Sequence, residues 1–228
     1  MKQSKKILIA NRGVIAIRAL RAARELGYSV ASVYSTIDRD QKHLKLSDEA
    51  ICIGPPETKD SYLNEAAIIS AAELSGADAI YPGFGFLAEN ASFAEKCRES
   101  GFKFIGPDPE VISIMGDKIK AKELAKSLNI PVVPGYEGEI STGNEAIKIV
   151  EEIGYPVIIK ASAGGGGRGM RVVNSSDELW QSIQSAQNEA ELAFGDGKIF
   201  IEKYLKKPRH IEVQIFGNGK GEAVHLFT

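Results

Sequence analysis

Short apolar runs alternate with amphipathic stretches over residues 1–110. This alternation predicts strands in the runs and helices in the stretches. The expected strands are Lys6–Ala10, Ser29–Tyr34, Glu49–Ile53, Ala77–Tyr81 and Lys103–Ile105, and the expected helices are Val14–Leu26, Asn64–Ser75 and Ala91–Ser100. Strands that alternate with helices pair in parallel, so we expect an open α/β sheet whose ligands bind beyond the carboxyl ends of its strands.

The pattern changes after Pro109, where two helical pieces precede Pro131 and Pro134. The expected helices are Val111–Met115, Ile119–Leu128 and Asn144–Ile153, with a further helix that a capping box of Ser175 and Glu178 begins. The expected strands are Pro156–Ala161, Met170–Val173, Ile199–Lys203, His210–Phe216 and Glu222–Leu226. Gly217-Asn218-Gly219-Lys220 is a hairpin signal between the last two strands. The second half is therefore mostly antiparallel β plus α.

Charge and composition exclude several classes of protein. The 228 residues contain 28 Lys+Arg and 30 Asp+Glu, and this net charge of -2 lacks the basic excess that binding to a nucleic-acid backbone demands. The length allows one large domain or two smaller ones. No apolar run reaches the ~18 residues that cross a bilayer, and the polar start is not a signal peptide, so we expect a cytosolic protein. Cys52 and Cys97 lack metal or disulfide spacing.

The strongest local signal is the glycine-rich stretch between Lys160 and Arg171. Five glycines, Gly164, Gly165, Gly166, Gly167 and Gly169, lack the Cβ atoms that would keep the backbone from wrapping an anion. Lys160 at a strand end and Arg168 within the stretch add charge-assisted contacts. Met170 and Arg171 stand where a Walker A loop requires Lys and Ser/Thr. We expect a mobile anion-binding lid, with a plain hairpin tip as the alternative.

A second glycine motif, Gly83-Phe84-Gly85-Phe86-Leu87-Ala88, follows an expected strand and precedes an expected helix. It satisfies the looser G-x-G-x-x-A dinucleotide fingerprint, although it does not follow the first strand. Two other interpretations remain open. The segment is either a turn whose two Phe side chains pack inward or a substrate-lining loop that carries Glu89 and Asn90.

Three further positions are ambiguous when taken alone. Lys118 at a helix start opposes the helix dipole, which suits either a solvated surface or a nearby anion. The strand end Glu202–Leu205 has backbone groups that could bind an adenine edge, but it is otherwise ordinary. No second His or Cys stands at metal-ligand spacing from His210, so we predict no metal site from these residues.

Taken together, the motifs resemble the front half of the biotin carboxylase family, the ATP-grasp component of biotin-dependent acetyl-, propionyl- and methylcrotonyl-CoA carboxylases and of pyruvate carboxylase. The matching stretches are Ile9–Gly13, Tyr81–Asn90, Phe104–Pro107, Met115–Lys118, Gly154–Ala161, Gly164–Arg171, Glu202–Tyr204 and Pro208–Glu212. The resemblance implies a Rossmann-like, pre-ATP-grasp domain over 1–116. It implies an incomplete α+β ATP-grasp domain over 117–228, with a lid subdomain over about 132–204.

The same resemblance implies how the residues function. Lys118, Lys160 and Arg168 would be catalytic and would hold the phosphates of ATP. The nucleotide would also contact Gly164, Gly165, Gly166, Gly167, Gly169, Met170, Glu202, Lys203, Tyr204, Leu205 and His210, and the substrate pocket would include Gly83, Phe84 and Glu89. The implied reaction activates bicarbonate with MgATP to carboxyphosphate and carboxylates carrier-bound biotin. The implied partners are a biotin carrier, a carboxyltransferase component and a second copy of the chain.

Three departures from the family pattern are visible. Val14 stands where Glu is common, Phe84 where Tyr is usual, and Thr228 where an acidic strand residue is expected. We expect the magnesium ligands downstream, on a longer polypeptide, and no turnover from this chain alone. The alternative functions are another ATP-grasp ligase of the carbamoyl phosphate synthase type and a non-catalytic dinucleotide-binding module.

Overall fold

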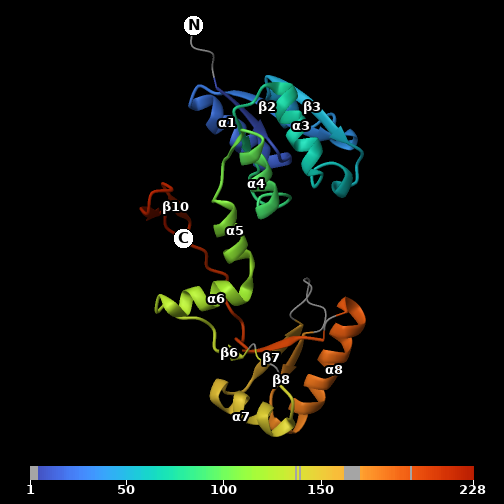
Figure 1. The fold of residues 1–228 in the computed structure, drawn as a ribbon, viewed down its shortest axis with the longest axis vertical. Coiled ribbons are helices and arrows are strands. Elements are labelled where there is room, and N and C mark those ends of the chain that lie inside the picture. The colour runs from blue at the N-terminus through green and yellow to red at the C-terminus, as the bar shows by residue number, and fades with distance from the viewer. Residues whose placement is uncertain (1–4, 137, 139, 162–169, 196) are drawn as a thin grey trace. The chain divides into compact units, whose positions relative to one another are not determined.

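A computed structural model describes residues 5–136, 138, 140–161, 170–195 and 197–228. The chain divides into two compact units, Met1–Ala121 and Lys122–Thr228, and each is described by itself (Figure 1). No helix among the described residues is long and apolar enough to cross a membrane.

The first unit is built on a five-stranded sheet in the order β3-β2-β1-β4-β5, in which all neighbouring strands are parallel. The strands are β1 (Lys6–Ile9), β2 (Ser29–Ser35), β3 (Glu49–Gly54), β4 (Ala79–Tyr81) and β5 (Lys103–Phe104). The helices are α1 (Gly13–Glu25), α2 (Lys42–Leu46), α3 (Glu65–Ser75), α4 (Ala91–Glu99) and α5 (Pro109–Gly116), with 3-10 turns at Thr36–Asp38 and Thr58–Asp60. The predicted parallel α/β sheet is confirmed.

Alternate residues of the central strand β1 enter two separate cores. Leu8 lies in the larger core with Ile68 of α3 and Phe93 of α4, whereas Ile9 lies in a smaller core with Leu20 of α1. Both faces of the sheet are therefore covered, as parallel sheets require. Cys97 is buried in the larger core, where burial raises the pKa of its thiol to about 12.

The second unit contains a four-stranded antiparallel sheet in the order β6-β9-β7-β8. Its strands are β6 (Gly135–Tyr136), β7 (Val157–Ala161), β8 (Arg171–Val173) and β9 (Ile199–Lys203), and its helices are α7 (Gly143–Ile153) and α8 (Ser176–Phe194). Helix α6 (Lys118–Ser127) crosses the boundary between the units, and β10 (Ile215–Gly217) pairs with β11 (Ala223–His225) in a hairpin. Side chains from α7 and α8 form an apolar core against one face of the sheet.

Two local predictions in this unit are wrong. The strand expected over His210–Phe216 is reduced to β10, because no strand among the described residues pairs with residues 210–213. The capping box also does not form: the Ser175 side chain makes no capping bond, and the Glu178 carboxylate accepts the N–H of Asn174 instead. The predicted hairpin turn is confirmed, since Asn218 Oδ1 accepts the N–H groups of Lys220 and Glu222.

Candidate functional site

Strand register places two charged residues on the face of the second sheet that lies opposite its helices. Val157 and Ile159 of β7 are buried in the core with α7 and α8, so Lys160 between its buried neighbours points to the other face. Lys160 pairs directly with Phe200 of β9, and Glu202 is the diagonal neighbour on the same face.

Glu202 is held by two lysines at once. Lys160 Nζ donates to Glu202 Oε2 at 2.7 Å, and Lys122 Nζ of α6 donates to Glu202 Oε1. The Phe200 ring centroid lies 5.7 Å from each ammonium, within the range of a cation–π interaction. Two lysines and one carboxylate give this cluster (Lys122, Lys160 and Glu202) a net charge of about +1 when all three are ionised.

Partial burial strengthens these charge interactions. The side chains of Lys122, Lys160 and Glu202 are 21%, 31% and 14% exposed. Burial by itself raises the pKa of the Glu202 carboxyl, but the hydrogen bonds and positive charges of Lys122 and Lys160 outweigh it, and the pKa is lowered. Glu202 is therefore an anion at neutral pH. The surplus positive charge lies on a sheet face that could receive a second anion.

Gly135 of β6 leaves space for the Glu202 side chain. It pairs with Glu202 across the strand ladder. A Cβ atom at residue 135 would lie 2.7 Å from the Ile201 carbonyl oxygen and 3.2 Å from Glu202 Cγ. A larger residue would therefore displace β9 or the Glu202 side chain.

The residues that follow Glu202 at the strand end differ in whether their polar groups already have hydrogen-bond partners. Lys203 Nζ donates to the carbonyls of Gly154 and Tyr155 at 2.9 and 2.7 Å, which places this ammonium at the C-terminus of α7. The backbone N–H of Lys203 donates to Pro134 and that of Tyr204 to Pro156. Among the described residues, no bond is found from the Leu205 N–H, which is therefore the candidate backbone donor here.

The other predicted nucleotide residues lie on separate elements or outside the described residues. Lys118 is the exposed first residue of α6, where Asp117 Oδ1 accepts the N–H groups of Ile119 and Lys120. Met170 is exposed immediately before β8. His210 is exposed and pairs with Glu212 at 2.9 Å. The predicted contacts Gly164, Gly165, Gly166, Gly167, Arg168 and Gly169 lie outside the described residues.

The loop that follows β4 separates its two phenylalanines. Phe84 is 72% exposed, whereas Phe86 stacks on Tyr62 with a centroid distance of 4.9 Å. The Asn11 side-chain amide donates to the carbonyls of Pro82 and Phe84, and thereby ties the loop to the end of β1. The inward-packing interpretation therefore holds for Phe86 and not for Phe84, and the substrate-lining interpretation stays a prediction.

The same loop does not have the geometry of a dinucleotide fingerprint. Gly83 has a φ of +70°, and a Cβ there would lie 2.6 Å from an Ile15 methyl carbon, so its backbone is already packed against protein. Helix α4 begins only at Ala91, and its N-terminus is capped by the Asn90 side chain, which accepts the N–H of Phe93. The loop thus does not present free helix amides to a pyrophosphate.

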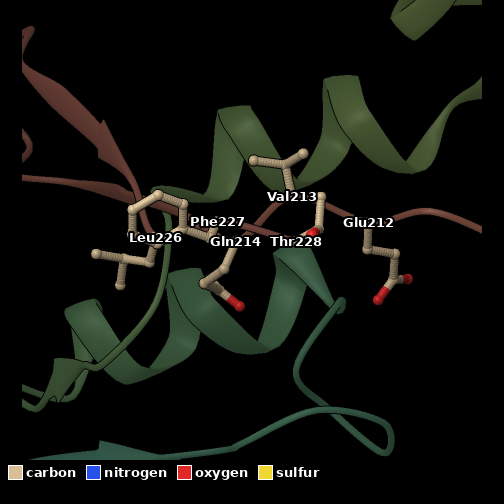
Figure 2. A pocket seen from close by; sticks show the side chains of 6 residues that line it. All are labelled: Glu212, Val213, Gln214, Leu226, Phe227 and Thr228. Carbon is tan, nitrogen blue, oxygen red and sulfur yellow. The ribbon is translucent and has the colours of Figure 1, made fainter.

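Two hollows near predicted site residues offer fewer charged groups than the lysine cluster. Exposed Glu89 lines a cavity of about 240 Å³ in the first unit, together with Ala88, Pro107, Val111, Ile112, Met115 and Gly116. Figure 2 shows a hollow beside the hairpin of the second unit, lined by Glu212, Val213, Gln214, Leu226, Phe227 and Thr228. Within the described part of the chain, no group of three or more His, Cys, Asp or Glu residues could hold a metal ion.

Sequence patterns missed a second carboxylate cluster, in the first unit. Asp38 Oδ2 accepts hydrogen bonds from Tyr62 at 2.8 Å, Ser35 at 3.0 Å and Arg12 at 3.1 Å. The Arg12 guanidinium also lies 5.3 Å from the Tyr62 ring centroid. These residues are 3 to 26 positions from Asp38 in the chain, so only the fold brings them together.

The chain matches two family models and several curated proteins. Residues 3–112 match the biotin carboxylase N-terminal domain, and residues 117–228 match the ATP-binding domain of the carbamoyl-phosphate synthase L chain. The chain is 54% identical over 222 residues to biotin carboxylase of Pseudomonas aeruginosa, with 97% of this chain and 49% of that protein covered. It is 52% identical to biotin carboxylase 1 of Bacillus subtilis, with 97% and 49% covered. The chain spans about half the length of the curated relatives it matches.

Solved structures agree with these matches. A complex of Campylobacter jejuni biotin carboxylase with β-γ-ATP has a TM-score of 0.84 at 52% identity, with 97% of this chain and 50% of that chain covered. The biotin carboxylase domain of 2-oxoglutarate carboxylase from Hydrogenobacter thermophilus, in complex with MgADP, ADP and bicarbonate, has a TM-score of 0.82 at 47% identity, with 99% and 49% covered.

Proposed function

This chain belongs to the biotin carboxylase family, and we propose that it supplies the nucleotide-binding part of a biotin carboxylase. In the proposed reaction, bicarbonate attacks the γ-phosphate of MgATP and displaces ADP to give carboxyphosphate. Carboxyphosphate breaks down to inorganic phosphate and carbon dioxide, and the deprotonated ureido nitrogen of carrier-bound biotin attacks the carbon dioxide. The observation that carries the proposal is the cationic cluster of Lys122, Lys160 and Glu202 on the open sheet face. Phosphoryl transfer depends mainly on such positioned charge.

The phosphate contacts follow from the chemistry of the lysines. Lys160, at the end of β7, would donate to phosphate oxygens, and Lys118, at the start of α6, is proposed to do the same. Arg168 and the glycines Gly164, Gly165, Gly166, Gly167 and Gly169, with Met170, are proposed to close over the triphosphate as the lid, within a subdomain of residues 132–204. Closure would keep water from the carboxyphosphate.

The adenine and ribose contacts are proposed for the strand end. The Leu205 N–H and the Lys203 carbonyl would bind the adenine edge, with Glu202 and Tyr204 beside them, and His210 would lie on the ribose side. The Lys203 ammonium is not part of this proposal, because it already binds the Gly154 and Tyr155 carbonyls. The lysine cluster fits a polyphosphate, and the described residues contain no group of three or more His, Cys, Asp or Glu that could hold a metal ion, so we derive no step through the metal.

The biotin side is proposed for the first unit. Exposed Phe84, with Gly83 and Glu89, would line the substrate pocket, and the Asn11 bonds to the loop would fix its shape. The proposed partners are a biotin carrier, a carboxyltransferase component and a second copy of the chain. We further propose a domain boundary at residues 116/117.

A second candidate function has one specific observation in its favour. Residues 117–228 match a model of the carbamoyl-phosphate synthase ATP-binding domain, so another ATP-grasp carboxylate ligase would use the same lysine cluster. The dinucleotide-binding alternative is disfavoured, because Gly83 is packed against Ile15 and its loop does not open a helix.

Calorimetric titration of the chain with ATP and with NAD tests the proposal. We expect ATP to bind and NAD to show no measurable heat of binding. Preferential NAD binding that Gly83→Val abolishes would contradict the proposal and support a dinucleotide-binding module. Lys148→Ala, which removes an exposed lysine from α7, is the control and should retain ATP binding.

A further inference from the structure

Lys122, the second lysine that donates to the Glu202 carboxylate, has no role in the phosphate contacts proposed above. Lys122 comes from α6, whereas Lys160 and Glu202 come from neighbouring strands of the sheet. The two ammonium groups divide the carboxylate between them, because Lys122 binds Oε1 and Lys160 binds Oε2.

The cluster with two lysines differs from a single Lys160–Glu202 pair in its net charge. With Lys160 alone, the pair would be neutral, and a phosphate would have to compete with Glu202 for the only ammonium. With Lys122 present, the cluster has a net charge of about +1, and Glu202 keeps a counterion when Lys160 turns away. Breaking a partly buried ion pair without replacement is costly because the remaining charge is left unpaired. A second lysine removes most of that cost.

We propose that Lys122 is a positioning residue for nucleotide binding: it holds the Glu202 carboxylate so that Lys160 can exchange this carboxylate for a phosphate oxygen. The inference rests on the proposed function and adds Lys122 to the residues that act in it. Lysine suits such an exchange, since its ammonium is a point charge on a flexible stem and is not committed to one planar geometry. The Phe200 ring, 5.7 Å from both ammonium groups, stabilises the two like charges near each other.

This role predicts a pattern across four forms of the chain. The cluster charge is about +1 in the unsubstituted chain, 0 in Lys122→Met, +2 in Glu202→Gln and +1 in the double variant. We expect Lys122→Met to weaken ATP binding about tenfold, which corresponds to 1.4 kcal/mol. Adding Glu202→Gln to Lys122→Met should restore ATP affinity to within about threefold, since no carboxylate then competes for Lys160.

Calorimetric titrations with ATP and adenosine measure the pattern. Adenosine affinity should not change in Lys122→Met, because adenosine carries no phosphate for Lys160 and Lys122 is not among the proposed adenine contacts. Lys122→Arg retains the charge and should bind ATP nearly as well as the unsubstituted chain. Lys126→Met removes an exposed lysine from the same helix and is the matched control. Fluorescence of Trp180, the single tryptophan of the chain, checks that the second unit is folded.

Several results would overturn the inference. Unchanged ATP affinity in Lys122→Met would show that the second lysine does not assist binding. A loss that Glu202→Gln does not restore would mean that Lys122 contacts the nucleotide itself, and an equal loss for adenosine would mean damage to the fold. In these three cases the unsubstituted chain still binds ATP and the proposed function stands. Absence of ATP binding by the unsubstituted chain would instead overturn the proposed function, and this inference with it.

Discussion

Each unit of the chain holds a largely buried carboxylate in a cationic setting, but the two sites are built differently. Asp38 in the first unit is 7% exposed, and Glu202 in the second is 14% exposed. Asp38 accepts bonds from two hydroxyl groups and one guanidinium, so its charge is balanced by Arg12 alone. Glu202 is bound by two ammonium groups and has no hydroxyl partner among the described residues.

The difference separates a structural site from the proposed binding site. Hydroxyl groups within the core have fixed positions and carry no charge that an incoming anion could use. The Asp38 cluster is therefore neutral, and it fixes η1 (Thr36–Asp38) and the start of α1 to Tyr62 in the core. The Glu202 cluster retains a positive charge on flexible side chains. A surplus of mobile cations, not burial, indicates where a phosphate would bind.

The largest effect is expected from removing the lysine that is proposed to bind phosphate. Lys160→Ala should weaken ATP binding by about a hundredfold, because charge-assisted hydrogen bonds contribute about 1.5–3 kcal/mol each. The stability of the first unit should not change. Calorimetry measures the affinity, with Lys148→Ala as the control. Full ATP affinity in Lys160→Ala would remove this residue from the binding site and end the contrast between the clusters.

Removing the other carboxylate should affect stability and not binding. Asp38→Ala leaves the Tyr62 and Ser35 hydroxyls without their acceptor, which should destabilise the first unit by about 2 kcal/mol. ATP affinity should stay within about twofold. Hydrogen exchange of the β2 amides in the first unit measures the destabilisation, and Asp40→Ala at a neighbouring exposed position is the control. A large loss of ATP affinity would show that the Asp38 cluster belongs to the nucleotide site.

A smaller effect is expected where the backbone makes space for Glu202. Gly135→Ala places a Cβ 2.7 Å from the Ile201 carbonyl oxygen and should destabilise the second unit by about 1–2 kcal/mol. ATP affinity should fall several-fold, because β9 must move. Gly217→Ala is the matched control, since its Cβ would lie 3.8 Å from the Glu222 carbonyl oxygen, an ordinary van der Waals distance. Urea unfolding followed by Trp180 fluorescence measures the stability; equal values for the two variants would show that Gly135 has no such role.

The smallest effect is expected from acid. Burial alone raises the pKa of both carboxyls, but their hydrogen bonds and cationic neighbours lower it below the usual 3.8 for Asp38 and 4.5 for Glu202. A carboxylate with a lowered pKa stabilises the fold above the pKa of the unfolded chain, and this stabilisation is lost as the pH falls through the lowered value. Unfolding measured between pH 6 and pH 3 should therefore depend less on pH in Asp38→Asn and Glu202→Gln. Unchanged pH dependence in both variants would contradict this assignment.

Much of the fold could be predicted from the sequence because its signals are local. The alternation of apolar runs and amphipathic stretches gave the parallel sheet of the first unit, and the expected bounds of Ile199–Lys203 agree with β9. Short elements could not be predicted in this way. Helix α2 has five residues and β6 only two, too few for a periodic pattern. The strand expected over His210–Phe216 had an apolar pattern but lacks a pairing partner over most of its length.

The candidate site was predictable only in part. Lys160 follows an apolar strand and precedes the glycines, so its place at a strand end could be predicted. Its partners could not, because Glu202 is 42 residues away and Lys122 is 80 residues from Glu202. Lysines at four-residue spacing, Lys118, Lys122 and Lys126, follow one another in this region, so the spacing alone does not single out Lys122.

Covalent labelling with an acyl-phosphate derivative of ATP tests the central claim most directly. This reagent transfers its acyl group to a lysine Nζ that lies beside the bound phosphates, and mass spectrometry of the digested chain locates the modified residue. We predict labelling of Lys160 that excess ATP suppresses and NAD does not, with exposed Lys148 labelled only at the background level. Labelling that spares Lys160, or that excess ATP leaves unchanged, would contradict the claim that this sheet face binds the phosphates of ATP.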